Sequence, residues 1–235
     1  LQAQNPTMED FQGLEGCNEI LNVTRPDMVA AVHNAYLEVG VDAIETNTFG
    51  ANWANLAEYE AEDRIYELAL AGAKIARECA DKYSTSERPR YVLGSLGPGT
   101  KLPTLGHTTY ENLKNAYELA AQGLIDGGCD GLLIETAQDL LQAKAAVNGS
   151  RAAITKSEKD IKELETEVEK LKDPFNDSGL SEVDTQKISK TQNEIDDKLK
   201  KIYSNLDPWQ TTMVARHEDR PKSKFFIDNL FEDFV

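Results

Sequence analysis

The fold is decided by two similar stretches of sequence, Gly40-Val41-Asp42-Ala43-Ile44-Glu45-Thr46 and Gly128-Cys129-Asp130-Gly131-Leu132-Leu133-Ile134-Glu135-Thr136. Each stretch consists of a glycine turn, a short apolar strand and a Glu-Thr pair, and a helical pattern precedes it. A further apolar strand is predicted between them, at Arg90–Leu96. Near-continuous apolar strands separated by helices indicate a parallel sheet that is covered on both faces. The predicted fold class is therefore α/β.

The first predicted helix begins at Thr24–Asp27. Thr24 can accept a hydrogen bond from an early N–H, and Pro26 has the φ angle that a first turn requires. The helix is expected to stop at Gly40. Spacing places four residues on its apolar face, namely Met28, Val32, Ala35 and Val39.

Two longer helices are predicted further along the chain. An Ala/Glu-rich helix is expected over roughly residues 55–82. The capping box Thr108–Glu111 predicts the start of another helix, which runs to about Asp126.

Polar residues follow the predicted strands. In a (β/α) barrel the carboxyl ends of the strands carry the chemistry, and there one rim would be lined by Glu45, Asn47, Ser95 and Glu135. The alternative is that the two glutamates cap the next helices or pair with local backbone. The residues alone leave both interpretations open.

The sequence changes character near Ser150. Only Gly149 and Gly179 of the 15 glycines follow residue 131. Beyond Ser150 apolar residues recur at the heptad spacing of paired helices, and Asp173-Pro174 interrupts the pattern. The two apolar rows are Ile154, Ile161, Leu164, Val168 and Leu171, then Ile188, Ile195, Leu199, Ile202 and Leu206. An antiparallel helical hairpin is predicted, with domains at residues 1–150 and 151–235.

Composition argues against several function classes. The 235 residues include 25 Lys+Arg against 41 Asp+Glu, a net charge of −16, which disfavours nucleic-acid binding because that affinity rests on clustered basic residues. No run of 18 apolar residues occurs, so no membrane span is expected. The three cysteines lack C-x-x-C spacing, which is typical of a reducing cytoplasm. Leu1–Gln4 has no signal-peptide features, and a truncated or processed start is expected.

Five short motifs in residues 1–150 belong together: Gly16-Cys17-Asn18-Glu19, Glu45-Thr46-Asn47-Thr48-Phe49, Gly94-Ser95-Leu96-Gly97-Pro98, Lys101-Leu102-Pro103-Thr104 and Ile134-Glu135-Thr136. In combination they resemble the homocysteine-binding module at the start of cobalamin-dependent methionine synthases. The resemblance implies a (β/α)₈ barrel that binds homocysteine through a zinc-bound thiolate and receives a methyl group from methylcobalamin. Zinc lowers the thiol pKa, which keeps the sulfur nucleophilic at neutral pH.

The sequence departs from the family pattern in three ways. The family's glycine-rich first strand would precede Leu1, and a complete barrel needs about 250 residues. The family's zinc-binding cysteines follow later strands, so Cys17, Cys79 and Cys129 do not take their place. The expected fold is a partial (β/α) barrel of three to four βα units followed by an α-helical hairpin. We expect this module to be truncated and inactive alone, and to bind neither zinc nor cobalamin.

Only substrate-side positions carry over from the family, and these are Asn47, Phe49, Ser95 and Glu135. The Glu135 carboxylate is expected to meet the homocysteine ammonium group. Asn47 and Ser95 are expected to hydrogen-bond the polar end of the amino acid. No catalytic residue and no metal ligand is predicted within the chain.

A second set of motifs lies near the C-terminus, where Trp209-Gln210 is followed by Val214–Pro221, an Ala-Arg-His-x-x-Arg-Pro pattern. These residues resemble the N-terminal region of the carboxyltransferase α subunit of bacterial acetyl-CoA carboxylase, an enzyme of fatty acid biosynthesis, and the match covers roughly Ile154–Val235. The resemblance implies helices that wrap a partner or sibling carboxyltransferase subunit. That family's catalytic core lies further along, so His217 is expected to be structural.

Two functions therefore compete: a homocysteine S-methyltransferase module, and a subunit-interaction fragment of a carboxyltransferase. A third reading is a non-catalytic interaction protein built on the helical hairpin. The junction near Ser150 has three possible origins, which are a natural fusion, an engineered chimera and joined reading frames. Two truncations that meet at one point favour the last.

Overall fold

Three parallel strands form one sheet in the computed structural model, which describes residues 1–172 and 185–203. The strands are β1 (Ala43–Glu45), β2 (Tyr91–Leu96) and β3 (Gly131–Ile134), and they lie in the order β1-β2-β3. Both ladders are parallel, with Ile44 opposite Val92 and Ser95 opposite Leu133. The predicted α/β class with a parallel sheet is confirmed.

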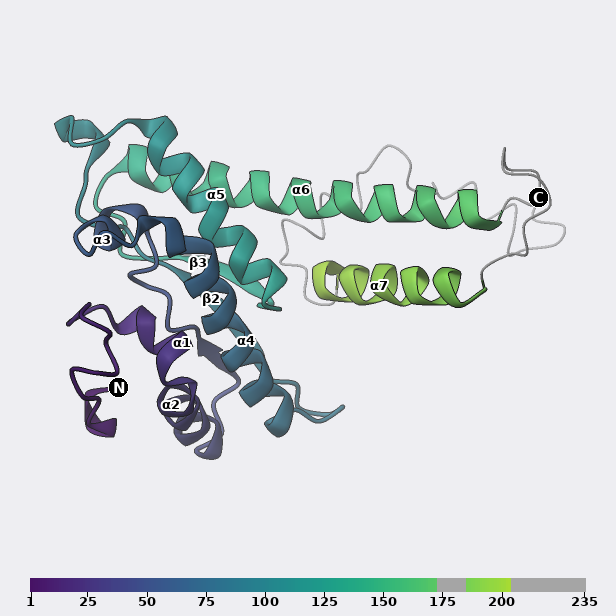
Figure 1. Ribbon diagram of the computed structural model, residues 1–235, viewed down its shortest axis with the longest axis horizontal. Coiled ribbons are helices and arrows are strands. Elements are labelled where there is room, and N and C mark those ends of the chain that lie inside the picture. The colour runs from purple at the N-terminus through teal and green to yellow at the C-terminus, as the bar shows by residue number, and fades with distance from the viewer. Residues whose placement is uncertain (173–184, 204–235) are drawn as a thin grey trace, which may run out of the picture.

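Helices pack against this sheet and hide most of it in Figure 1. The helices are α1 (Leu21–Thr24), α2 (Pro26–Glu38), α3 (Trp53–Ala57), α4 (Ile65–Tyr83), α5 (Tyr110–Asp126), α6 (Leu140–Lys172) and α7 (Thr185–Tyr203), with short 3₁₀ turns at Gln2–Gln4, Asn18–Ile20, Glu62–Arg64 and Pro103–Leu105. Within the described ranges, no helix is long and apolar enough to span a bilayer.

The two faces of the sheet are buried to different degrees. Val92 is fully buried among the helices, and a Cβ at Gly94 would lie 2.9 Å from Leu124 Cδ1 on α5. Residues on the opposite face, such as Leu93 and Leu133, are only half-buried. The expectation that both faces are covered is therefore not met by the described residues, because all the long helices that contact the strands pack on one side.

The helix predicted over residues 55–82 is two helices. Asn52 caps the short helix α3, and its Oδ1 accepts from Asn55 N at 3.0 Å. Glu60 then adopts a left-handed φ of 54°, which ends the helical path before α4 begins at Ile65. The alanine-rich composition concealed this break, because Glu60 is a good helix former at an unusual backbone angle.

The buried face of α2 differs from the predicted one. Val29, His33 and Leu37 are buried at intervals of four residues, together with Met28, whereas Val39 lies beyond the helix end and is 79% exposed. Of the predicted apolar face, Val32 is half-buried and Ala35 is exposed, whereas His33, which was not predicted, is part of the buried stripe. Val29 and Leu37, four residues before and after His33, lie on the same side of the helix.

Two helix starts lie one residue away from their predicted positions. Thr24 ends α1, and Arg25 is the residue that precedes α2. Thr109 rather than Thr108 caps α5, and its Oγ1 accepts from Asn112 N at 3.1 Å. Adjacent threonines have the same capping chemistry, so the sequence could not select between them.

Helix α6 continues across the domain boundary that was expected at Ser150, since it runs without a break from Leu140 to Lys172. Its first half packs on α5, and its second half packs on α7 (Figure 1). In the second contact Val168 and Ile195 are buried, and Lys187 Nζ lies 2.9 Å from Glu167 Oε1. Leu206 and residues 209–235, including His217, lie outside the described residues.

Close approach of α5 and α6 depends on Gly149. A Cβ at this position would lie 2.5 Å from Lys114 O and 2.8 Å from Glu118 N, which are backbone atoms of α5. We expect Gly149→Ala to lower the free energy of unfolding in urea by about 1–2 kcal/mol, because overpacking outweighs the gain in helix propensity. Gly131→Ala is the control, since a Cβ there meets only Leu93 Cδ2 at 3.6 Å. Equal stability of the two variants would contradict this packing argument.

Candidate functional site

Two of the predicted site residues are in direct contact at the carboxyl ends of adjacent strands. Ser95 Oγ donates a hydrogen bond to Glu135 Oε1 at 2.5 Å. Ser95 is 2% exposed, whereas Glu135 is half-buried and follows β3 directly. The pair thus combines a fixed hydroxyl with a carboxylate that remains accessible to a ligand.

Two threonines after β1 hold Ser95 in place. Thr46 Oγ1 accepts from Ser95 N at 3.0 Å, and Thr48 Oγ1 donates to Ser95 O at 2.7 Å. The two threonine hydroxyls are 2.6 Å apart and buried. Because the Thr48 proton is used on the Ser95 carbonyl, Thr46 is the donor between them. Sequence reasoning did not single out these threonines, although both lie in a motif it quoted.

Asn47 makes no hydrogen bond to Ser95 or Glu135 among the described residues and is held by other partners. Its Nδ2 donates to Asn18 O and to Asn22 Oδ1, both at 2.9 Å. Asn22 Nδ2 donates in return to Asn47 O at 2.8 Å. Both amide hydrogens of Asn47 are therefore engaged, and the side-chain oxygen Oδ1 is the group it still offers.

Phe49 lies in the same loop with 42% of its surface exposed. A Cβ at Gly97 would lie 2.9 Å from Phe49 Cδ2 and would also collide with the Phe49 carbonyl oxygen. Glycine at position 97 therefore lets the loop after β1 lie directly against the loop after β2. This contact brings Phe49 to the same end of the sheet as Ser95.

Glu19 is a buried carboxyl that sequence reasoning missed as an individual residue. Its Oε1 accepts from Gly50 N at 2.7 Å, and it is 9% exposed. Cys17 Sγ lies 3.8 Å from the other carboxyl oxygen. Burial raises the pKa of Glu19, and burial together with the Glu19 charge raises the pKa of Cys17. The sequence pointed to Glu19 only through its place in the motif Gly16–Glu19.

The thiols in the described residues do not fit the zinc ion that the methionine synthase resemblance implies. Cys17, Cys79 and Cys129 are free and buried, and no group of three or more His, Cys, Asp or Glu residues converges anywhere in residues 1–172 and 185–203. Burial raises the pKa of all three thiols, that of Cys129 to about 12. Zinc binds the thiolate form, which these environments disfavour.

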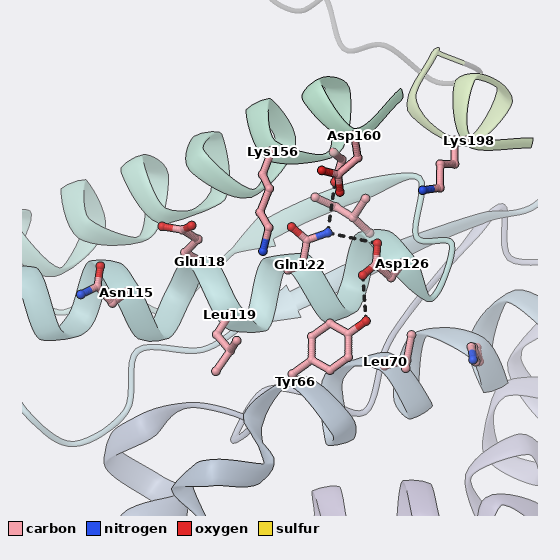
Figure 2. A pocket seen from close by; sticks show the side chains of 13 residues that line it. Tyr66, Leu70, Asn115, Glu118, Leu119, Gln122, Asp126, Lys156, Asp160 and Lys198 are labelled. Carbon is pink, nitrogen blue, oxygen red and sulfur yellow. Dashed lines mark hydrogen bonds between the residues drawn. The ribbon is translucent and has the colours of Figure 1, made fainter. Parts of the chain in front are cut away.

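A separate groove of about 740 Å³ lies between α4, α5, α6 and α7 (Figure 2). Tyr66 Oη donates to Asp126 Oδ2 at 2.8 Å, and Gln122 Nε2 donates to Asp126 Oδ1 and Ser157 Oγ. Burial and the Asp126 carboxylate raise the pKa of Tyr66 to about 12. The central polar groups thus bind one another, on the helical side of the sheet and away from Ser95 and Glu135.

The family model for homocysteine S-methyltransferase matches residues 1–172. The chain belongs to the homocysteine S-methyltransferase family. A second family model, acetyl co-enzyme A carboxylase carboxyltransferase-like, matches residues 154–235. Both resemblances carried by the sequence motifs are confirmed, and the two matches overlap within α6.

Curated relatives are similar to different parts of the chain. Methionine synthase of Mycobacterium tuberculosis is 58% identical over 161 residues, which are 68% of this chain and 14% of that protein. Methionine synthase of Mycobacterium leprae is 55% identical over 161 residues, 68% of this chain and 13% of that protein. The acetyl-coenzyme A carboxylase carboxyl transferase subunit alpha of Pelagibacter ubique is 77% identical over 78 residues, 33% of this chain and 21% of that protein. The chain therefore spans a small part of each relative.

Among solved structures, the oxidized form of the homocysteine methyltransferase MmuM from Escherichia coli has the same fold over the matched part. The comparison gives a TM-score of 0.51 at 19% identity, and it covers 64% of this chain and 54% of that one. At this identity the likeness concerns the fold alone.

The buried carboxyl of Glu19 leads to a prediction about pH. A pKa raised by burial means that the native state holds the proton to higher pH than the unfolded chain does. The contribution of this carboxyl to stability is therefore fully present below the unfolded pKa and is lost as the pH rises through the folded pKa. We expect the free energy of unfolding of wild type, minus that of Glu19→Gln, to fall as the pH rises above about 4, where the unfolded chain starts to lose this proton.

Urea denaturation at several pH values measures this difference. Glu111→Gln is the matched control, since the Glu111 side chain on α5 is 63% exposed. A wild-type minus Glu19→Gln difference that does not change with pH would show that Glu19 burial has no energetic effect.

Proposed function

We propose that this chain is the homocysteine-binding part of a methionine synthase-type methyltransferase. The observation that carries the proposal is the hydrogen-bonded pair Ser95 and Glu135 at the carboxyl ends of adjacent parallel strands, in a member of the homocysteine S-methyltransferase family. Ligands of α/β proteins bind at this end of the sheet. The three strands are, in this proposal, consecutive strands of a (β/α) barrel.

The proposed binding groups divide the amino acid between them. The Glu135 carboxylate pairs with the homocysteine ammonium group. Ser95 Oγ donates a hydrogen bond to one oxygen of this carboxylate and thereby fixes the orientation of the Glu135 side chain. Asn47 offers its Oδ1 as an acceptor to the polar end of homocysteine, because both of its amide hydrogens are donated to Asn18 and Asn22. The exposed ring of Phe49 covers the apolar carbon chain of the ligand.

We propose further that the chain binds homocysteine without methylating it and binds neither zinc nor cobalamin. A zinc ion would supply the thiolate activation of this chemistry. The buried, protonated thiols of Cys17, Cys79 and Cys129 support the proposal, since they do not form a zinc site.

Isothermal titration calorimetry with L-homocysteine under reducing conditions tests the proposed site. We expect Glu135→Gln to weaken binding by about 10-fold to 100-fold, because it removes a charge-assisted hydrogen bond worth about 1.5–3 kcal/mol. Glu111→Gln, on the exposed surface of α5, is expected to bind like wild type. Equal affinity of Glu135→Gln and wild type would exclude the proposed ammonium contact.

A second candidate function concerns the other end of the chain. The 77% identity to a carboxyl transferase alpha subunit over 78 residues favours a subunit-binding role for residues 151–235. In this proposal the α6–α7 pair contacts a carboxyltransferase partner, and residues 1–150 form the other unit.

Co-purification of the full chain with a bacterial carboxyltransferase β subunit tests this second candidate. We expect retention at micromolar concentration, and loss of retention when Ile195→Asp places a charge in the buried α6–α7 contact. Glu194→Gln, on the exposed side of α7, is the control. Absence of retention for wild type would dispose of this function.

A further inference from the structure

Helix α6 follows Glu135 in the chain, and its first turn carries a buried amide. Gln142 lies just after the helix begins at Leu140, and it is 0% exposed. Its Nε2 donates to Pro98 O at 2.8 Å, and its Oε1 accepts from Gln138 N at 3.0 Å. The opposite orientation of the amide would direct N–H against N–H and oxygen against oxygen, so only this orientation satisfies both partners.

These two hydrogen bonds join the segments that follow Ser95 and Glu135. Pro98 lies just beyond β2, three residues after Ser95. Gln138 lies between β3 and α6, three residues after Glu135. The side chain of Gln142 is therefore a bridge between the two residues of the candidate site that contact each other.

The two residues need this bridge to different degrees. Ser95 belongs to β2, is 2% exposed, and is held by the hydroxyls of Thr46 and Thr48. Glu135, by contrast, begins an irregular segment in which the next residues are exposed. Thr136 there has a left-handed φ of 56°, which a β-branched residue adopts only where its surroundings impose it. The direction of the Glu135 side chain therefore depends on what holds this segment.

The first turn of α6 is itself anchored, so Gln142 can act as a fixed point. Asp139 Oδ1 accepts from Gln142 N at 2.6 Å, and Asp139 Oδ2 accepts from Thr104 Oγ1 at 2.7 Å. Thr104 belongs to the loop after β2, so this exposed connection joins the same two segments. The amide of Gln142 is shielded from water, where hydrogen bonds are electrostatically stronger than at the surface.

We propose that Gln142 is a positioning residue of the homocysteine site. Its buried amide holds the segment after β3 so that Glu135 meets the Ser95 hydroxyl and presents its carboxylate to the ammonium group of the ligand. This role rests on the proposed function, because the ligand is homocysteine, but the position of Glu135 can be measured without any ligand.

Carbon-13 NMR of the Glu135 carboxyl group in the full chain tests this role. Gln142→Met nearly keeps the length of the side chain and removes both hydrogen bonds. We expect the Glu135 Cδ resonance to move toward its position in Ser95→Ala, where the hydrogen bond to Glu135 is absent. Gln122→Met is the matched control, since Gln122 also makes two side-chain hydrogen bonds, but in the groove on the helical side. An unchanged resonance in Gln142→Met, or an equal change in Gln122→Met, would overturn the proposal.

A second variant avoids the buried position. Gln138→Pro removes the backbone N–H that Gln142 Oε1 accepts, and Gln138 is exposed, so the core keeps its side chains. The Glu135 resonance is expected to move in the same direction as in Gln142→Met. An unchanged resonance would overturn the proposal even where Gln142→Met fails to fold.

Calorimetric titration with L-homocysteine under reducing conditions shows whether Gln142 acts through Glu135. We expect Gln142→Met to weaken binding by about 3-fold to 30-fold in the wild-type background and to change it little in Glu135→Gln, because coupled residues are not additive. Equal losses in both backgrounds would overturn the proposal, since a merely structural role affects both alike. Absence of binding by wild type would instead exclude the proposed function, and the Glu135 resonance would still decide whether Gln142 positions this carboxylate.

Discussion

The hydrogen bonds of Ser95 connect all three strands at their carboxyl ends, and the arrangement of the candidate site depends on them. Its amide and carbonyl bind the hydroxyls of Thr46 and Thr48, which follow β1, and its own hydroxyl binds Glu135 after β3. Beyond β1 the backbone no longer continues as a strand, so the two threonines supply partners that a ladder would otherwise provide. A buried backbone group left without a partner costs about 1–3 kcal/mol, which explains why hydroxyl residues are placed here.

On the helical side of the sheet, glycines allow neighbouring helices to approach one another closely. A Cβ at Gly123 would lie 2.7 Å from Tyr66 O, and one at Gly127 would lie 2.9 Å from Leu70 O, so α5 lies nearly in backbone contact with α4. Gly149 has the same effect between α6 and α5. The three helices therefore form a thin, tightly packed layer, in which small side chains replace large apolar ones. The parallel ladder between β2 and β3, which this layer covers, sets the separation that lets Ser95 reach Glu135.

Sequence patterns predicted the strands because each strand is short and apolar and has a glycine near one of its ends. The end of α5 at Asp126 was predicted for a similar local reason, since glycines follow it. What the patterns missed depends on tertiary contacts. His33 is buried although it is polar, on a helix that packs against α4 and β1. Glu60 takes a left-handed backbone angle that its residue type does not favour. Glu19 becomes a buried carboxyl only because Gly50, 31 residues away, donates to it.

Helix α6 runs without a break through the residues where the two family matches overlap. In an α-helix each backbone N–H bonds to the carbonyl four residues earlier. The backbone can therefore continue as one helix even where the similarity of the sequence changes from one family to another. Each half of the helix then needs its own packing partner. Ser157 Oγ accepts a hydrogen bond from Gln122 Nε2 on α5. Further along α6, Val168 is buried together with Ile195 of α7. The two family matches overlap at residues 154–172, which is where the partner of α6 changes from α5 to α7. A strand at this junction would have needed a continuous ladder with one sheet, whereas a helix can exchange neighbours within a few turns.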